Sequence, residues 1–211
     1  RDINAYLNFQ SGKSNLLLKD YNQISGIEFK DNLDLNVSIQ NDNCLRYSGL
    51  IIKDLKIKES PDWLKKRLTS IGVKSINNIV DITNYVLHDI GQPLHAFDYK
   101  KINGKEIIVR NAKDGEKIVT LDEISRDLNN EDLLICNDKN PMCIAGVMGG
   151  IESSVNSGTK SIFLESALFD QISVRKSAKN HSISSDASFR FERGVDPSIT
   201  IKSLKYAASL I

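Results

Sequence analysis

The chain has 211 residues, of which 40% are hydrophobic and 26% are charged, with 28 basic and 27 acidic side chains. This composition is typical of a globular protein and provides enough apolar residues for one large or two small cores. The formal net charge of +1 excludes a basic field that would wrap RNA over the whole surface, so any nucleic-acid contact must be local or supplied by another part of a larger protein.

The first 40 residues are predicted to lead out of a preceding domain. Residues 1–9 read as the end of a helix, and the polar residues 10–35, rich in Asn, Asp and Lys, read as a linker. Apolar and polar residues alternate over 33–39, which predicts a strand. Residues 47–57 are predicted to form a second strand.

Two helices follow, each with recognisable ends. In SPDWLKKRLTSIG, Ser60 is predicted to cap the helix, Pro61 to occupy its first turn and Gly72 to end it. The next helix is predicted over 78–90, with Gly91 as its stop.

The second half of the chain alternates short strands with helices. A hairpin is predicted to turn near Asp122 and Glu123, a helix to begin at the cap Asp170, and a last helix to open at Pro197. Because there is no regular βαβ repeat, the fold class is α+β, with mixed β-sheets packed with helices in a single large domain. The predicted strands are 107–110, 117–121, 132–136 and 162–165.

The cysteines and the hydropathy pattern narrow the class further. Cys44, Cys136 and Cys143 are odd in number and lack CxxC spacing, which favours reduced, buried thiols over a metal or redox site. No apolar run approaches the roughly 20 residues that a membrane span needs, and no signal peptide is visible. The chain starts without methionine and ends in an apolar helical stretch, so we expect a piece cut from a longer protein.

His95 is the first candidate for chemistry. It is predicted to lie in a short loop between the helix stop Gly91 and an aromatic residue, with Pro93 stiffening the approach. No cysteine or second histidine stands at ligand spacing, so a zinc site is not predicted. His88 and His181 are read as structural, the latter complementing a helix end.

Thr83 and Asn84 lie in the helix before His95. Thr83 falls on or beside the apolar stripe. Its hydroxyl is therefore expected either to bond the Ile79 carbonyl or to face a cavity.

Glu165 is surrounded by apolar residues in SIFLESALFD. A carboxylate in such a run is costly to bury without hydrogen bonds. It is expected either to be paired with an internal arginine or backbone amides, or to be a specificity group that awaits a donor from a ligand.

Two further segments contain candidates of lower specificity. The glycines of IAGVMGGIESSV, among them Gly146, let backbone amides approach a ligand, although a bulged strand or turn explains them as well and the spacing is not that of a phosphate loop. In SSDASFRFERGVDP, Arg190, Glu192 and Arg193 fit an ion-pair network or an RNA contact, while Ala187 offers only space.

Together these segments resemble the beta subunit of bacterial phenylalanyl-tRNA synthetase. The resemblance extends over about Cys44 to Pro197 in the family's order and spacing. The matching segments are RYSGLIIKDLKIKESPDWLKKRL, NNIVDITNYVLHDIGQPLHAFD, IAGVMGGIESSV, FLESALFD and SSDASFRFERGVDP.

The resemblance implies an editing module that hydrolyses tyrosine wrongly attached to the phenylalanine tRNA. It implies that residues 41–197 form the editing domain, that 1–40 are an exit helix and linker, and that 198–211 lead into the next domain. Phe189 stands where the family often has histidine, and no role is assigned to it. The residues carried over are His95, Thr83 and Asn84 for catalysis, and Glu165, Gly146, Ser185 and Ala187 for binding the substrate.

The expected chemistry is a double sieve followed by ester hydrolysis. Glu165 would accept the phenolic hydrogen bond of tyrosine, His95 would orient or deprotonate a water, and no covalent intermediate or metal is expected. The expected partners are the acceptor end of tRNA(Phe) and the alpha subunit of a cytoplasmic heterotetramer. No cofactor is expected for the fragment, and ATP and Mg²⁺ are implied only for the assembled synthetase. The alternatives are a noncatalytic tRNA-docking or subunit-interaction module, with Lys65–Arg67 as a candidate contact, and a free-standing aminoacyl-tRNA deacylase.

Overall fold

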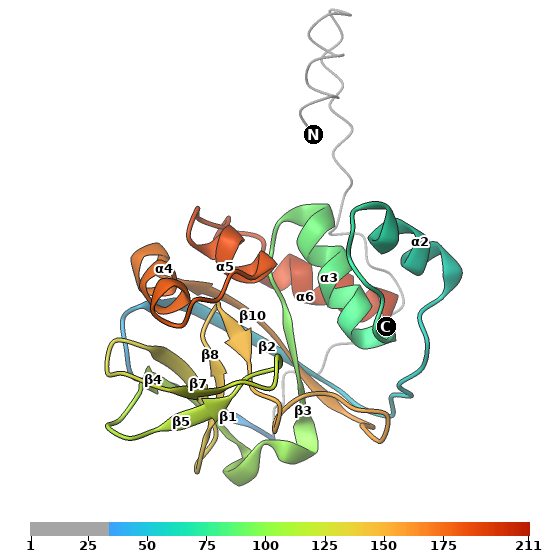
Figure 1. The fold of residues 1–211 in the computed structure, drawn as a ribbon. Helices are drawn as coiled ribbons and strands as arrows, with labels where there is room; N and C mark the ends of the chain where they lie inside the picture. The colour runs from blue at the N-terminus through green and yellow to red at the C-terminus, as the bar shows by residue number, and fades with distance from the viewer. Residues whose placement is uncertain (1–33) are drawn as a thin grey trace, which may run out of the picture.

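The computed structural model describes residues 34–211, so the predicted helix end and most of the predicted linker lie outside the described residues (Figure 1). The described part combines three β-sheets with helices. The α+β prediction is therefore confirmed.

A five-stranded sheet has the order β1-β4-β7-β8-β9. β1 runs parallel to β4, whereas the remaining neighbours are antiparallel. All four residues of β7 are buried, as expected for a central strand. The strands are β1 (Asn36–Ile39), β4 (Glu106–Asn111), β7 (Leu133–Cys136), β8 (Pro141–Ile144) and β9 (Met148–Gly149).

A three-stranded sheet has β10 (Ile162–Phe169) between β2 (Cys44–Ile52) and β3 (His95–Asp98), antiparallel to both. A separate hairpin pairs β5 (Lys117–Val119) with β6 (Ser125–Asp127). Its turn includes Glu123 in the left-handed region, with φ of 64°, as the hairpin prediction anticipated.

The helices form two groups. α2, α3 and α6 lie together beside the three-stranded sheet, and α4 and α5 lie over the other end of the molecule (Figure 1). The helices are α2 (Asp62–Ser70), α3 (Asn78–Ile90), α4 (Gln171–Asn180), α5 (Asp186–Phe191) and α6 (Thr200–Leu210), with short 3-10 turns η1 (Tyr99–Lys101) and η2 (Asn103–Lys105).

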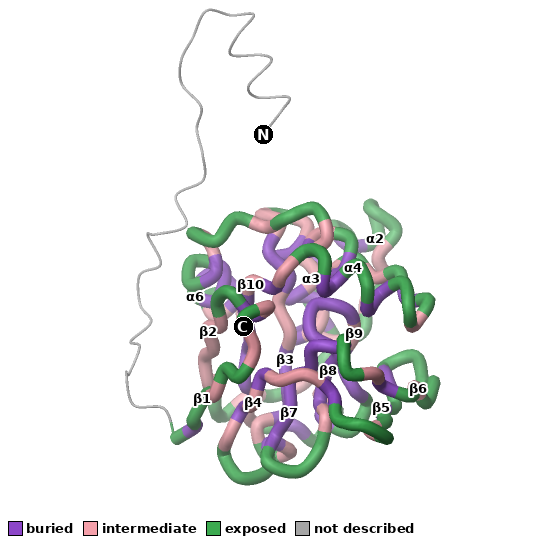
Figure 2. Tube along the Cα trace, turned by 90° about the vertical axis from the view of Figure 1, so that its left-hand side faces the viewer, coloured by how far each residue is buried: buried purple, intermediate pink, exposed green. Residues whose placement is uncertain are grey.

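β10 separates two apolar cores, because alternate residues of a strand point to opposite faces. Phe163 and Ala167 face the larger core, which includes the five-stranded sheet. Ile162 and Leu164 face a second core formed with α2, α3 and α6. Figure 2 shows the buried residues concentrated along the central strands. Glu165 lies two residues after Phe163 in the same strand and points to the same face of the sheet, so its carboxyl lies on the side of the larger core.

Local sequence explains the helix ends, with one exception. The Asn77 side chain accepts hydrogen bonds from the amides of Ile79 and Val80, and Gly91 ends α3 with φ of 85°. The Ser60 cap was predicted wrongly, since α2 begins after Pro61 without a side-chain cap. The Ser60 hydroxyl instead donates to the buried Asp81 carboxylate at 2.5 Å.

Four elements differ from the prediction. His95 begins strand β3 rather than lying in a loop, because residues 95–98 pair with residues 162–165 of β10, and this long-range pairing leaves no local signal. The short helix α5 was also not anticipated, since the alternation of small, aromatic and charged residues in its sequence is not helical in period. The strands β8 and β9 were not anticipated either, but the turn reading of the glycine-rich segment is confirmed, since residues 145–147 form the turn that joins these two strands.

Candidate functional site

Glu165 is the most unusual side chain of the three-stranded sheet. It lies in the middle of β10, opposite Gly49 of β2 on one side and His95 of β3 on the other. Only 5% of its surface is exposed. Burial raises the pKa of this carboxyl to about 8, because the charged form loses its hydration.

The partner of Glu165 is the hydroxyl of Tyr47, which donates to Oε2 at 2.8 Å. This is neither the arginine nor the backbone amide that the sequence suggested. Among the described residues, none donates a hydrogen bond to the second oxygen, Oε1. A carboxylate offers about four acceptor positions, so most of the capacity of Glu165 is unused.

His95 lies beside Glu165 on the same face of the sheet. Residues opposite each other on antiparallel strands have Cβ atoms roughly 4.5–5.5 Å apart. The Nε2 atom of His95 is buried and has no hydrogen-bond partner among the described residues. Burial lowers the pKa of the imidazole to about 4, so the ring is neutral at pH 7 and can accept a proton.

Gly149 explains how the imidazole fits. A Cβ at this position would lie 2.5 Å from Cε1 and 2.8 Å from Nε2 of His95. Only a glycine permits the β9 backbone to pass so close to the ring. The glycine-rich segment therefore contributes Gly149 to the surroundings of His95, a role that the sequence did not indicate.

Aromatic rings surround the two polar groups. The ring of Tyr47 stacks with Phe163 at 6.4 Å between centroids, and Phe163 lies 6.4 Å from Phe97. Phe97 in turn meets His95 edge to face at 4.4 Å. The carboxyl of Glu165 and the imidazole thus lie in an apolar, aromatic setting, where an unmade hydrogen bond is costly.

Gly146 lies farther into the larger core. Its φ of 70° favours glycine, and a Cβ there would lie 2.9 Å from Val174 and about 3 Å from the rings of Phe191 and Phe169. Among the described residues, none accepts a hydrogen bond from the Gly146 amide. The amide is therefore available to a ligand, although the other contacts of Gly146 are those of packing.

Ser185 joins α5 to the glycine-rich turn. Its Oγ accepts from the Ser188 amide as the helix cap and donates to the Val147 carbonyl at 2.7 Å. Both hydrogen-bonding roles of this hydroxyl are thus used within the chain. Ala187, the second residue of α5, is half-buried against the larger core.

Thr83 and Asn84 belong to helix α3, not to the sheet that contains Glu165 and His95. The apolar stripe of α3 packs on the opposite face of the three-stranded sheet from Glu165. The Thr83 hydroxyl donates to the Val80 carbonyl at 2.7 Å, not to Ile79. Asn84 shares a helix face with His88, whose Nε2 lies 3.7 Å from the Asp186 carboxylate at the start of α5.

The structure thus brings together His95 and Glu165, and it connects Ser185 and Ala187 to the turn that contains Gly146. Among the described residues, no hydrogen bond joins Thr83 or Asn84 of α3 to His95 or Glu165. Tyr47 was missed because only the pairing of β2 with β10 shows that its phenol reaches Glu165.

The cysteines contribute no reactive group. All three are buried and unpaired, as predicted, and burial raises the pKa of the Cys44 thiol to about 12 and that of Cys136 to about 11. Within residues 34–211, no group of three His, Cys, Asp or Glu side chains could hold a metal ion, and no helix is long and apolar enough to cross a bilayer.

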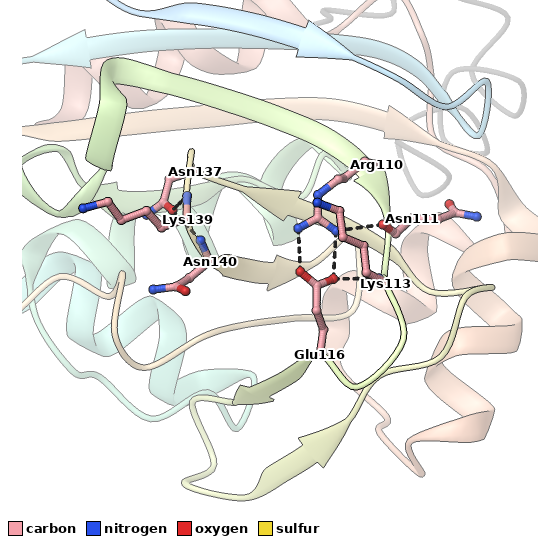
Figure 3. A network of polar contacts seen from close by, with 7 residues as sticks. All are labelled: Arg110, Asn111, Lys113, Glu116, Asn137, Lys139 and Asn140. Carbon is pink, nitrogen blue, oxygen red and sulfur yellow. Dashed lines mark hydrogen bonds and ion pairs between the residues drawn. The ribbon is translucent and has the colours of Figure 1, made fainter.

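A separate polar network lies around β4 (Figure 3). The guanidinium of Arg110 donates to both oxygens of Glu116 at 2.8 and 2.6 Å, and the Lys113 amide donates to the same carboxylate at 2.7 Å. Asn137 accepts from the amides of Lys139 and Asn140 in a neighbouring turn. Two adjoining surface hollows share Asn140, Pro141, Glu152 and Ser153, and a third borders α5 near Ser188 and Phe189; neither His95 nor Glu165 lines any of the three.

Comparison with known proteins gives concordant matches. Residues 43–211 match the family described as the B3/4 domain. The whole chain is 49% identical to 26% of the phenylalanine–tRNA ligase beta subunit of Bacteroides fragilis, and 80% of it is 53% identical to 21% of that of Porphyromonas gingivalis. The chain thus spans about a quarter of the length of these relatives.

A solved structure agrees at the level of the fold. An N-terminal fragment of the phenylalanyl-tRNA synthetase beta subunit from Pyrococcus horikoshii superposes with a TM-score of 0.51 at 15% identity, over 74% of this chain and 51% of that fragment.

Proposed function

Since this chain belongs to the B3/4 domain family and is similar over its whole length to phenylalanine–tRNA ligase beta subunits, we propose that it is an editing module that hydrolyses the ester of tyrosyl-tRNA(Phe). One observation carries the proposal. Glu165, a buried carboxyl with an unpartnered oxygen, lies opposite His95, a neutral imidazole with an unpartnered Nε2.

Glu165 provides the selectivity in this proposal. Tyrosine and phenylalanine differ by one hydroxyl, and the Oε1 atom of Glu165 accepts a hydrogen bond from the phenol of the tyrosyl group. A phenylalanyl group would exclude water from the carboxyl without replacing its hydrogen bonds. That loss amounts to about 1–3 kcal/mol, or roughly a factor of 5 to 150 in preference.

His95 acts on the water that attacks the ester. Its low pKa keeps the imidazole neutral near pH 7, so Nε2 can accept a hydrogen bond from the water and orient it toward the ester. Proton abstraction by His95 requires that the bound substrate raise this pKa toward the working pH. The Gly146 amide, which has no acceptor among the described residues, is assigned as a donor to the substrate. Thr83 and Asn84 of α3 are assigned to the ester or the terminal ribose.

Ser185 and Ala187 form the wall of the pocket in this proposal. Ser185 fixes the start of α5 against the glycine-rich turn. Ala187 packs partly buried against the larger core, and its small side chain is assigned to the wall beside the tyrosyl ring. An Ala187→Trp substitution would fill that space and abolish tyrosyl hydrolysis while the domain remains folded.

The rest of the synthetic reaction is assigned to the assembled enzyme. We propose that the alpha subunit and tRNA(Phe) are its partners in the cytoplasm, and that ATP and Mg²⁺ serve aminoacylation outside this module. Residues 41–197 are proposed as the editing domain, with 1–40 entering and 198–211 leaving it. Because α6 packs against β10 and α3, removal of residues 198–211 would expose part of the second core, and the domain should fold only with them.

Deacylation by the assembled synthetase that contains this chain tests the proposal. We expect wild-type enzyme to hydrolyse tyrosyl-tRNA(Phe) in preference to phenylalanyl-tRNA(Phe). His95→Ala should lower the tyrosyl rate at least tenfold, a typical loss for a general base. Glu165→Ala should remove the preference between the two esters.

Glu131→Gln is the matched control, because among the described residues the side chain of this exposed glutamate pairs only with Lys176 at the surface. It should leave both rates unchanged. If His95→Ala and Glu165→Ala behave like this control, the editing proposal is wrong and a noncatalytic tRNA-docking role replaces it.

A further inference from the structure

Tyr47 is the one side chain that satisfies Glu165 within the described part of the chain. The phenol comes from β2, where the residue directly opposite Glu165 is Gly49. A Cβ on Gly49 would lie 2.1 Å from the Phe163 ring, so that ring fills the space beside the glycine. Tyr47 therefore reaches Glu165 diagonally from its own position opposite Ala167.

The direction of the phenol is fixed by packing. The Tyr47 ring is nearly parallel to that of Phe163, with 13° between the planes. In this orientation the hydroxyl donates to one carboxylate oxygen, Oε2, at 2.8 Å. The hydrogen bond thus selects which oxygen of Glu165 remains free.

We infer that Tyr47 is a positioning residue that sets the specificity of the site: by holding Oε2 of Glu165, it directs Oε1 toward the phenol of the substrate. This inference rests on the proposed editing function and adds a residue to it. The site then recognises a tyrosyl ester with two phenols on one carboxylate, one from the chain and one from the substrate. The substrate does not need to displace Tyr47, because a carboxylate can accept several hydrogen bonds.

The same contact favours the charged form of Glu165. Burial raises the pKa of the carboxyl, and the hydrogen bond from Tyr47 opposes that rise. An ionised carboxylate accepts strongly from a phenol and is heavily penalised beside a phenyl ring. Without the Tyr47 hydroxyl, Glu165 would hold its proton to higher pH and discriminate less.

The other titratable groups near Glu165 do not change charge in the relevant range. They come from β2, β8 and β3. Burial raises the pKa values of the Tyr47 phenol and of the Cys44 and Cys143 thiols, and it lowers that of His95 to about 4. A pH-dependent preference between pH 6 and 9 therefore reports on Glu165.

The test uses the assembled synthetase with Tyr47→Phe, which keeps the ring and removes only the hydroxyl. Tyr99→Phe is the matched control, since within residues 34–211 the Tyr99 hydroxyl donates a hydrogen bond only to the exposed Asp34 carbonyl, at 3.3 Å. Two preferences are measured from pH 6 to 9. The first is the ratio of hydrolysis rates for tyrosyl- and phenylalanyl-tRNA(Phe), and the second is the ratio of Kd values for stable amide-linked tyrosyl- and phenylalanyl-adenosine.

Tyr47→Phe should lower both preferences about tenfold at pH 9, where the wild-type Glu165 carboxyl is mostly ionised, because this is the loss expected for a hydrogen bond to a charged group. It should also move the midpoint of their pH dependence upward, and Tyr99→Phe should change neither. A purely structural role for Tyr47 would reduce activity toward both esters alike and leave the midpoint in place.

Unchanged or increased preferences in Tyr47→Phe would overturn the inference, an increase meaning that Tyr47 competes with the substrate. Wild-type enzyme that binds the tyrosyl amide selectively but hydrolyses neither ester would contradict the editing function alone, and the Kd ratios would still decide the role of Tyr47. If the wild-type enzyme shows no preference in either measurement, both the editing function and the role of Tyr47 are contradicted.

Discussion

Glu116 and Glu165 are two shielded glutamates of the same domain with opposite surroundings. Glu116 receives two hydrogen bonds from Arg110 and one from the Lys113 amide, and these donors hold the pKa of its carboxyl below the usual value (Figure 3). Glu165 receives one hydrogen bond, from Tyr47, and burial raises its pKa to about 8.

The difference separates a structural carboxylate from a candidate functional one. Glu116 joins β4 to the loop before β5, and the hydrogen bonds from Arg110 and the Lys113 amide satisfy both oxygens of its carboxylate. Glu165 keeps acceptor capacity that the described residues do not fill, at a position where burial makes this costly. Proteins keep buried polar groups with unmade hydrogen bonds mainly where a ligand supplies the missing partner.

Replacing Glu165 should change the pH dependence of the free energy of unfolding more than any other substitution considered below. A raised pKa means that the folded chain holds the proton more tightly, so the stabilisation is fully present below about pH 4.5 and is lost as the pH rises through about 8. By pH 9 the wild-type chain should have lost roughly 4 kcal/mol that Glu165→Gln retains. Urea unfolding of both chains from pH 5 to 9 measures this difference.

Glu116→Gln is the control of opposite sign for that series. Because the pKa of Glu116 is lowered, its contribution is present above the unfolded pKa and is lost as the pH falls through the folded value. Parallel curves for wild type and Glu165→Gln between pH 5 and 9 would show that Glu165 is not the strained carboxylate inferred here.

Breaking the satisfied network should have the next largest effect. Arg110→Ala leaves Glu116 with only the Lys113 amide, and we expect a loss of about 2–3 kcal/mol in the free energy of unfolding. Lys176→Ala, which removes the partner of Glu131 from an exposed surface pair, should cost less than about 0.5 kcal/mol. Equal losses in the two variants, measured by urea unfolding at pH 7, would contradict the distinction.

Replacing Ser185 should have the smallest effect on stability. It tests a candidate-site residue whose hydroxyl already makes its hydrogen bonds within the chain. Ser185→Ala removes the cap of α5 and the bond to Val147, at a cost of about 1 kcal/mol. Ser185→Thr keeps the hydroxyl and should be nearly neutral. Thermal unfolding of both variants measures these shifts, and a Ser185→Thr variant as unstable as Ser185→Ala would refute the capping role.

The sequence predicted those features that depend on neighbours along the chain. The ends of α3, the Asp170 cap of α4 and the turn of the β5–β6 hairpin follow from local capping and turn chemistry. The burial of Glu165 was also foreseeable, because apolar residues flank it on both sides. The buried, unpaired state of the cysteines followed from their spacing.

Features set by strand pairing were not predictable in this way. His95 is in a strand only because β10 pairs with it, and Tyr47 reaches Glu165 only because β2 pairs with the other edge. Ser60 was read as a cap from its place before Pro61, whereas Asp81, 21 residues later, takes its hydroxyl. Long-range partners override local signals in each case.

The central position of β10 also determines when this domain can fold during synthesis. β2 and β3 pair only with β10 in their sheet, and the register joins Cys44 to Phe169 and Ile52 to Ile162, separations of 125 and 110 residues. At roughly 5–20 residues per second, β2 leaves the ribosome several seconds before its partner. Tyr47, His95 and Glu165 therefore meet in one late event, and a ribosome that pauses before residue 162 holds a chain in which this sheet does not yet exist.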